Sequence, residues 1–414
     1  LSLLTVGSAL AAALGLLALL AQLGFKQYYL LRSMISVVIL GAGVDYVIFM
    51  IFRYLEEKGV QSSHETAVKR TALHAGGAVI LSASTVLIGF SSLALSSIGI
   101  LQSIGIGLAL GILLTLIGAL LTIPSALSII NERILWPKRT IPDFAIRLAV
   151  FRRMANYCVT KPKRVLALGL LATAALGAVI STISTTYSDL EMLPPFESKR
   201  GIETILSSFG AAPLSQTQIV VATREPLFTD GKVRVDLYQA IDRLHSEISN
   251  IPGVYSEYTY GPTRPRGSYI TPDGVDRSSI SQFVDEEGRT FVITASLKSF
   301  YTDDEAFSTV EKIREKASEV VKEEAALNGA EVLVGGGAAF YLDLTNRINH
   351  DFFYLIIPAA CTGIFLILLV ALGSVLLPLR LLATTAMSAI WAIAILTLLF
   401  QYGLGVKIYW LTPL

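Results

Sequence analysis

An aspartate stands in the middle of a strongly apolar stretch of this sequence. Asp45 is followed directly by Tyr46 within Ile35–Phe52, and it is the only acidic residue deep in any such stretch. Placing a carboxylate at the centre of a membrane costs about 2.5 to 3.5 kcal/mol, so such residues usually serve a function. Because desolvation favours the neutral acid, Asp45 could be protonated in one state and charged in another. This indicates a proton relay; the alternative is a structural carboxylate bonded to a neighbouring helix.

Hydroxyl groups near Asp45 could assist such a relay. Tyr46 could donate to the carboxylate or pass on a proton, although a tyrosine in a span can also simply pack or lie at the interface. The next apolar stretch places small or hydroxyl-bearing residues on one helical face: Ser82, Thr85, Gly89, Ser92 and Ser96. We expect Ser82, Thr85 and Ser92 to form a polar face that supports the relay, with tight packing alone as the alternative.

A row of small residues follows in the fourth apolar stretch. It repeats at every fourth position: Gly99, Ser103, Gly107, Gly111, Thr115 and Ala119. Such rows let helix backbones approach closely. We therefore expect Gly89, Ser103, Gly107 and Gly111 to be helix-packing residues. Pro124, near the end of this stretch, is expected to kink or terminate the helix.

Composition and hydropathy predict a membrane protein. Hydrophobic residues make up 53% of the 414 residues and charged residues 16%, whereas a soluble protein carries roughly a quarter charged residues. Seven apolar stretches reach the length of about 20 residues that a spanning helix needs. They are Leu3–Phe25, Ser33–Phe52, Ala78–Ser97, Gly99–Ile123, Val165–Ser184, Phe352–Leu372 and Leu376–Tyr402. The third and fourth must be separated by a very short turn around Ser96–Gly99.

The charges between the spans predict the orientation of the chain. Asn131–Arg164 has nine basic and two acidic residues, whereas Thr186–His350 has 16 basic and 25 acidic residues. Because cytoplasmic loops are enriched in Lys and Arg, the first segment is expected inside and the second outside. The mixed-charge, helical-looking loop Arg53–His74 then also falls inside. The chain is thus expected in the cell (plasma or inner) membrane, with the large block on the extracytoplasmic side.

Five regions follow along the chain. They are a bundle of four spans at 1–131, a basic cytoplasmic linker at 132–164, a span at 165–185, an external α+β domain at 186–350, and two spans at 351–414. Within the external block, strand and helix patterns follow one another as strand, helix, strand, strand, helix and strand. This succession is typical of a ferredoxin-like fold.

The last span resembles the first, which suggests an internal duplication. Ser8-Ala-Leu-Ala-Ala matches Ser388-Ala-Ile-Trp-Ala, and Leu23-Gly-Phe-Lys-Gln-Tyr-Tyr matches Leu404-Gly-Val-Lys-Ile-Tyr-Trp. Because membrane helices resemble one another, coincidence is the alternative. A duplication of this kind is a common transporter design and predicts twelve spans and two external domains in the complete protein.

Other chemistries find little support in the sequence. The balanced net charge of +1 argues against nucleic-acid binding. No ATP-binding P-loop pattern occurs, Cys158 and Cys361 give neither a disulfide framework nor a zinc site, and the four histidines are expected to be solvated or capping. Asp343 and Asp351 are expected to be interfacial polar residues, with a place in the lining of the substrate or water path as the alternative. We therefore expect no metal, no cofactor and no enzymatic activity; an intramembrane protease would need a second carboxylate in a span.

Several motifs together resemble one family of transporters. The run Gly41-Ala-Gly-Val-Asp-Tyr-Val-Ile-Phe, continuing to Glu57, resembles the fourth span of resistance–nodulation–division (RND) transporters. It is most similar to the mycobacterial-membrane-protein-large (MMPL) and hydrophobe/amphiphile exporter branches. Further similar segments are Ser82–Phe90, Leu121–Pro124, Tyr187–Pro194 and Phe209-Gly210. The chain departs from many relatives at Leu372-Gly373-Ser374, where they carry Phe-Arg-Ser.

The resemblance implies a fold and a function. The fold would be an internally duplicated helical bundle with a ferredoxin-like, porter-type external domain, of which this chain covers the third to the ninth span. Asp45 and Tyr46 would be one half of the proton relay, with a second Asp-Tyr pair beyond Leu414. The function would be proton-driven export of hydrophobic or amphiphilic molecules such as lipids or drugs. A non-exporting relative, either a protein-translocation accessory or a sterol- or lipid-handling protein, is the alternative, and a homo-oligomer (dimer or trimer) stays open.

Overall fold

The computed structural model describes residues 2–59, 63–130, 149–188, 190, 194, 196–229 and 232–409. Half of the expected basic linker, at 132–148, and part of the motif Tyr187–Pro194 lie outside the described residues. The chain forms two compact units. The membrane unit comprises Leu1–Ser181 and Arg347–Ile395, and the α+β unit comprises Thr182–Asn346 and Leu396–Leu414.

Seven helices in the described part of the chain are long and apolar enough to cross a membrane, which confirms the seven predicted spans. Five of them are α1 (Ser2–Gln22), α2 (Leu31–Gly59), α3 (His64–Leu93), α4 (Gly99–Ile130) and α6 (Pro162–Ile180). The other two are the continuous helix Gly337–Leu372, which ends with α12 (Ile357–Leu372), and the helix Leu376–Gly403, which begins with α13 (Leu376–Thr397). The short helix α5 (Ala149–Thr160) is not a candidate span. The turn expected around Ser96–Gly99 separates α3 from α4. The helical-looking loop Arg53–His74 is instead divided between the ends of α2 and α3.

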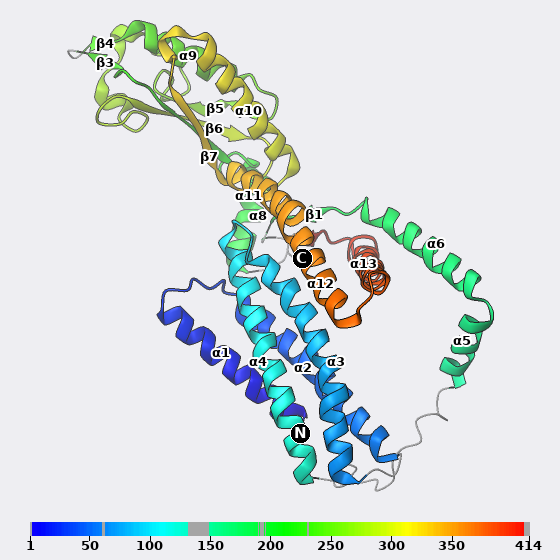
Figure 1. Cartoon of the computed structure of the whole chain (residues 1–414). Coiled ribbons are helices and arrows are strands. Elements are labelled where there is room, and N and C mark those ends of the chain that lie inside the picture. Colours follow the sequence, from blue (N-terminus) through cyan, green and yellow to red (C-terminus); the bar gives the residue numbers. More distant parts are fainter. Residues whose placement is uncertain are drawn as a thin grey trace. The chain divides into compact units, whose positions relative to one another are not determined.

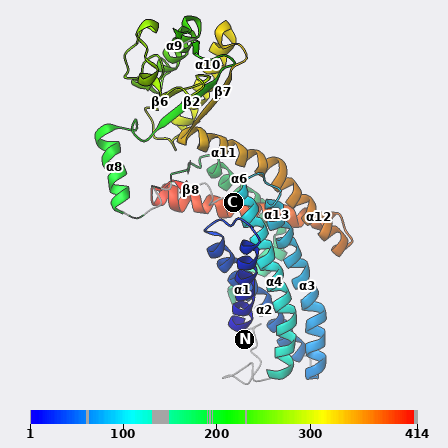
Figure 2. The same ribbon diagram turned by 90° about the vertical axis from the view of Figure 1, so that its left-hand side faces the viewer.

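The core of the membrane unit lies among α1 to α4, which run side by side (Figures 1 and 2). Its fully buried side chains include Ile35, Ile39, Val47, Ile112 and Ile123. Helix α4 continues through Pro124 to Ile130, so of the two expected effects of Pro124, termination of the helix is wrong, whereas a kink stays a prediction. A proline within a spanning helix removes one hydrogen bond, which the surrounding helices and hydroxyl side chains can compensate.

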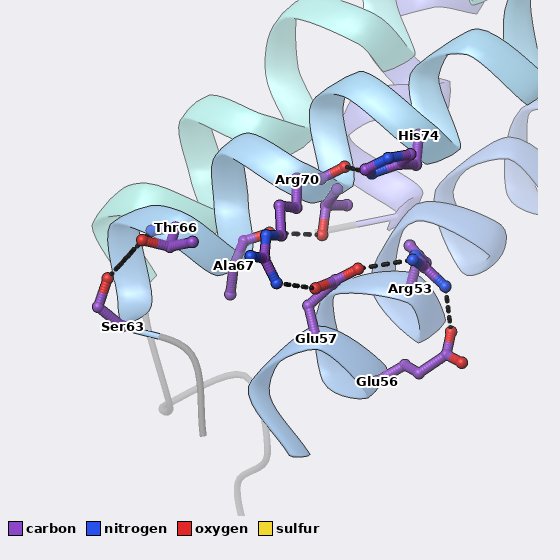
Figure 3. A network of polar contacts seen from close by, with 9 residues as sticks. Arg53, Glu56, Glu57, Ser63, Thr66, Ala67, Arg70 and His74 are labelled. Atoms are coloured by element: carbon purple, nitrogen blue, oxygen red, sulfur yellow. Dashed lines mark hydrogen bonds and ion pairs between the residues drawn. The ribbon is translucent and has the colours of Figure 1, made fainter. Parts of the chain in front are cut away.

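A polar network joins the end of α2 to the start of α3 (Figure 3). Glu57 is 7% exposed, and its carboxylate receives Arg53 Nη2 at 2.6 Å and Arg70 Nη1 at 3.4 Å. The Ser63 hydroxyl accepts a hydrogen bond from the backbone N–H of Thr66 at 3.3 Å and so caps α3. Because the same carboxylate meets a guanidinium from each helix, it fixes how α2 and α3 align.

The α+β unit has the predicted succession of strands and helices. The elements are β2 (Gln216–Ala222), α9 (Val235–Ser249), β5 (Val254–Tyr260), β6 (Thr290–Leu297), α10 (Asp304–Glu323) and β7 (Glu331–Gly336). The sheet order is β5-β6-β2-β7, and all neighbouring strands are antiparallel. In β2, Thr217, Ile219 and Val221 are buried and alternate with more exposed residues. Helices α9 and α10 therefore cover one face of this sheet (Figure 1).

Smaller elements complete the described chain. They are β1 (Thr185–Thr186), which pairs with β8 (Ile408–Tyr409), α8 (Glu197–Phe209), the hairpin β3 (Phe228–Thr229) and β4 (Lys232–Val233), and the 3-10 turns η2 (Pro272–Gly274), η3 (Arg277–Ile280) and η4 (Ala325–Leu327). Helix α11 (Gly337–Asp351) runs through a π-helical turn, η5 (Phe352–Ile356), into α12. A second π-helical turn, η6 (Leu398–Gly403), follows α13.

The π-helical turn η5 has a local cause. Pro358 is the second residue of α12, two residues after the last residue of the turn. A proline has no N–H to donate, and its ring crowds the carbonyl four residues before it. The chain widens by one residue here, with Ile357 N–H donating to the carbonyl of Phe352. The helix from Gly337 to Leu372 therefore continues without a break.

Candidate functional site

A cavity of about 430 Å³ lies between α2 and α3 in the membrane unit. Helix α2 contributes Ala42, Asp45, Tyr46 and Phe49, and helix α3 contributes Ala78, Val79, Ser82 and Val86. Positions 42, 45, 46 and 49 share one face of α2 because they follow the three- and four-residue spacing of a helix. The cavity wall is mainly apolar, and Asp45 is its only ionisable carboxylate.

Asp45 is exposed in this cavity. Among the residues that the structure describes, it has neither a hydrogen bond nor an ion pair. A carboxylate within a span must meet water or a polar group of the protein, because facing lipid alone is costly. The Asp45 carboxylate therefore faces the cavity with acceptor atoms that no described group uses.

Tyr46 lines the same cavity from a buried position. Its side chain is 6% exposed, and its hydroxyl group is buried without a hydrogen-bond partner in the described part of the chain. A buried hydroxyl without a partner is costly and rare in folded proteins. Tyr46 therefore lines the Asp45 cavity with a side chain whose hydroxyl has no hydrogen-bond partner among the described residues.

Only one residue of the polar face predicted on α3 lines the Asp45 cavity. Ser82 lines the cavity together with Asp45. Thr85 donates to the carbonyl oxygen of Ser82 at 2.7 Å and lines a neighbouring cavity instead. Ser92 is buried, donates to the carbonyl oxygen of Gly89 at 2.7 Å and does not line either cavity. The relay candidates that share one space are thus Asp45, Tyr46 and Ser82.

The neighbouring cavity, of about 480 Å³, is more apolar and was not expected from the sequence. Its lining comes from three helices: Ala78, Leu81, Ser82, Thr85 and Val86 of α3, Ile364 and Leu368 of α12, and Leu381, Leu382 and Thr385 of α13. Ala78, Ser82 and Val86 line both cavities. A carboxylate-bearing cavity and an apolar cavity therefore share one wall.

The small residues of α4 show close packing at most of the predicted positions. A methyl group added at Gly107 would lie 2.8 Å from Leu31 Cδ1, and one added at Gly111 would lie 3.2 Å from Ile39 Cδ1. The Ser103 hydroxyl is buried and accepts from the backbone N–H of Tyr28 at 3.2 Å. These contacts place α4 directly against the start of α2.

Two glycines differ from the predicted pattern. A methyl group at Gly89 would meet nothing within 4 Å, so the described residues give it no close neighbour. At Gly105 a methyl group would lie 2.6 Å from the carbonyl oxygen of Phe90 and 2.6 Å from Leu93 Cβ. Gly105 lies outside the four-residue row that the sequence suggested, and it is where α4 approaches the end of α3.

Comparison with known proteins gives the family. The family profile described as "MMPL family" matches residues 1–165 and 197–414. The chain belongs to the MMPL family. As part of a multi-pass membrane protein, it resembles the apo-petrobactin exporter of Bacillus anthracis, with 24% identity over 390 residues, 90% of this chain and 48% of that protein.

One further relative and one solved structure resemble this MMPL chain. The sulfolipid-1 exporter MmpL8 of Mycobacterium tuberculosis is 28% identical over 272 residues, 64% of this chain and 24% of that protein. Among solved structures, the hedgehog release protein Disp from the water bear Hypsibius dujardini has a TM-score of 0.63 at 11% identity, covering all of this chain and 55% of that one. At that identity the likeness concerns the fold alone. The chain spans about half the length of the apo-petrobactin exporter.

A second carboxylate of this MMPL chain, Asp351, is more deeply buried than expected for an interfacial residue. Its side chain is 0% exposed. Its Oδ2 accepts from Ser96 Oγ at 2.8 Å, from Ser97 N at 2.7 Å and from Ser97 Oγ at 2.8 Å. Asp343 matches the expectation better, since it is exposed and receives both Nη atoms of Arg314, at 2.6 and 2.8 Å.

The histidines were expected to be solvated or capping, and for His245 this is wrong. His245, on α9, is 1% exposed, and its Nδ1 has no hydrogen-bond partner among the described residues. Burial, and next the charge of Arg264, lowers the pKa of His245 to about 4, while Asp242 acts in the opposite direction. His245 is therefore neutral near pH 7. In the described part of the chain, no group of three His, Cys, Asp or Glu residues is arranged to hold a metal ion.

Proposed function

We propose that this MMPL chain is the part of a proton-driven exporter that carries one half of its proton relay. Asp45 would bind and release the proton, Tyr46 would donate to it or pass it on, and Ser82 would hold the path from the opposite wall. The observation that carries the proposal is the exposure of Asp45, without a partner among the described residues, in a cavity within an apolar bundle. A carboxylate so placed changes charge when it takes up a proton, which is the event a proton-coupled transporter needs.

The uncovered face of Asp45 also suggests where the rest of the relay would come from. On α2 this face includes Phe49, which is about half exposed, next to Asp45 itself. The proposed internal duplication provides a second set of spans, with a second Asp-Tyr pair beyond Leu414. We propose that this second half covers the face and completes the relay.

We propose that the exported substrate is a lipid or another amphiphile. Two relatives have names that describe export, one of sulfolipid-1 and one of apo-petrobactin. The apolar cavity beside Asp45 supports the same class, because it combines leucine, isoleucine and valine side chains with the hydroxyls of Ser82, Thr85 and Thr385. Such a lining suits a hydrocarbon chain better than a strongly charged solute.

The proposed location is the cell membrane, with the α+β unit outside. The excess of acidic residues in Thr186–His350 and of basic residues in Asn131–Arg164 supports this orientation. We further propose that the α+β unit is a ferredoxin-like domain of the porter type. Its four-stranded antiparallel sheet, with the order β5-β6-β2-β7 and two helices on one face, supports this assignment.

An export assay with the full-length protein tests the function. Cells that produce wild type or Asp45→Asn, or inverted vesicles prepared from them, would be supplied with a labelled lipid. Export of the lipid would be measured with and without a proton gradient. We expect gradient-dependent export by wild type and none by Asp45→Asn, because asparagine does not titrate. Asp343→Asn is the matched control, since Asp343 is exposed and lies in the α+β unit. Undiminished gradient-dependent export by Asp45→Asn would contradict the proposal.

A further inference from the structure

We infer that Asp351 is a positioning residue of the transport cycle, which clamps the helix leaving the α+β unit to the turn between α3 and α4. This inference rests on the proposed function, because it concerns how a change at Asp45 would reach the α+β unit. Asp351 does not touch the cavity that contains Asp45. It would act through the two serines that it binds.

The clamp consists of one carboxylate and one tight turn. Oδ2 of Asp351 accepts three hydrogen bonds, from Ser96 Oγ, Ser97 N and Ser97 Oγ, at 2.7 to 2.8 Å. Oδ1 faces Arg347 Nε and His350 Nδ1, each at 3.4 Å. Arg347 also donates to Ser97 Oγ, so Arg347 and Asp351, both on α11, contact the same serine.

The turn is rigid because its serines are bonded within it as well. The backbone N–H of Ile98 donates to Ser96 Oγ at 3.0 Å, and Gln102 Nε2 donates to the Ser96 carbonyl oxygen at 2.6 Å. Ser96 is 1% exposed and Asp351 is 0% exposed. Opening the clamp would leave a buried charge and several donors without partners, so the clamp is expected to stay closed while the helices move.

The clamp connects a helix that lines the Asp45 cavity to a helix that begins in the α+β unit. Helix α3, which ends at the turn, lines the Asp45 cavity through Ala78 and Ser82. Helix α11, which ends at Asp351, begins among the core residues of the α+β unit, where Ala338, Ala339 and Leu342 are buried. Helix α12 also lies directly against α3, where a methyl group on Gly363 would lie 2.6 Å from Ile88 Cγ2. A displacement of α3 would thus be passed to α11 through Asp351.

The test separates proton binding from export in the full-length protein. Dicyclohexylcarbodiimide reacts with protonated carboxyl groups in apolar surroundings, so the pH profile of Asp45 modification, read by mass spectrometry, reports on the proton site. Lipid export reports on the complete cycle. For Asp351→Asn we expect an unchanged pH profile at Asp45 and an approximately tenfold loss of export. Asp343→Asn, on the same helix but exposed and paired with Arg314, should leave both unchanged.

Two further variants keep the inference testable if Asp351→Asn fails to fold. Ser97→Ala removes one of the three hydrogen bonds and should lower export severalfold with the same Asp45 profile. The exchange Ser97→Asp with Asp351→Ser places the carboxylate on the turn and should restore part of the export lost in Asp351→Asn. Normal export by Asp351→Asn or Ser97→Ala, or an Asp45 profile that changes together with export, would overturn the inference. If Asp45→Asn itself exports normally, the proposed function fails instead.

Discussion

Asp45 and Ser82 lie on different helices but line one cavity. Ser82 also lines the apolar cavity formed with α12 and α13, whereas Asp45 does not. The relationship joins the proposed proton-binding group to the cavity that we propose accommodates a hydrocarbon chain. Coupling between two ligands requires that each changes the environment of the other, and a shared wall provides the shortest route.

Filling the shared wall should block transport. Ser82→Phe adds a ring to both cavities, and we expect export to fall about tenfold because the proton and the substrate lose their space together. Ile80→Phe is the control, since Ile80 is on the same helix, is 45% exposed and lines neither cavity. Initial export rates at equal protein levels measure both. Equal losses of export in the two variants would mean that any large side chain on α3 reduces export, and would contradict a specific role of the shared wall.

Removing the buried carboxylate between α2 and α3 should weaken the bundle. Glu57→Gln leaves Arg53 and Arg70 without their common partner. Because both arginines are partly exposed, we expect a loss of roughly 1–2 kcal/mol, below the cost of a fully buried pair. Glu56→Gln should have little effect, since the Glu56 side chain is 67% exposed. The midpoint of heat unfolding in detergent measures the difference; equal midpoints for the two variants would contradict it.

A methyl group at Gly105 should be poorly tolerated. It would lie 2.6 Å from a backbone oxygen and from a Cβ atom, neither of which can move away by rotating a side chain. We expect Gly105→Ala to destabilise the protein by about 1–3 kcal/mol. Gly89→Ala is the counterpart on α3, where the methyl group has open space and alanine favours the helix by up to about 1 kcal/mol. Heat unfolding of both variants should therefore shift in opposite directions.

Acid should destabilise the α+β unit through His245. Its folded pKa of about 4 lies below the ordinary value of 6.5, so the unfolded chain binds a proton that the folded chain does not. Stability is complete above pH 6.5 and falls as the pH drops toward 4, by roughly 3 kcal/mol in total. Hydrogen-exchange protection of α9 between pH 7 and pH 5, corrected for intrinsic rates, measures this slope.

The control for this pH effect is another histidine. His245→Gln should flatten the slope, whereas His350→Gln should keep it, because His350 is exposed. If the slope survives in His245→Gln, another group is responsible.

The spans and strands could be predicted because they depend on local sequence. Hydropathy over about 20 residues marks a spanning helix, and alternation marks a half-buried strand such as β2. The position of Asp45 within a span follows from the same counting. Asp45 and Ser82 share a cavity, which is compatible with their positions on the two helices. The shared cavity also depends on the alignment of α2 and α3, to which Glu57 contributes.

The features missed by sequence reasoning depend on contacts between distant segments. The sequence predicts an interfacial residue at Asp351, and only the contact between α11 and the Ser96–Gly99 turn shows that it is buried. Gly105 is one of many small residues in the sequence, and only the close approach of α4 to Phe90 distinguishes it. His245 is buried on α9, and the chain directly after β5 approaches it so closely that a methyl group on Gly261 would lie 3.1 Å from its Nδ1. Glu57 lies four residues after Arg53, a spacing that is equally common on solvated helices.

Proton uptake coupled to transport tests the central claim most directly. The full-length protein would be reconstituted into vesicles containing a pH-sensitive dye, and proton movement would be recorded when a lipid substrate is added. We predict substrate-dependent proton flux with wild type, no flux with Asp45→Asn, and normal flux with Asp343→Asn. Substrate-dependent proton flux that persists in folded, membrane-inserted Asp45→Asn would contradict the assignment of Asp45 as the proton-binding residue.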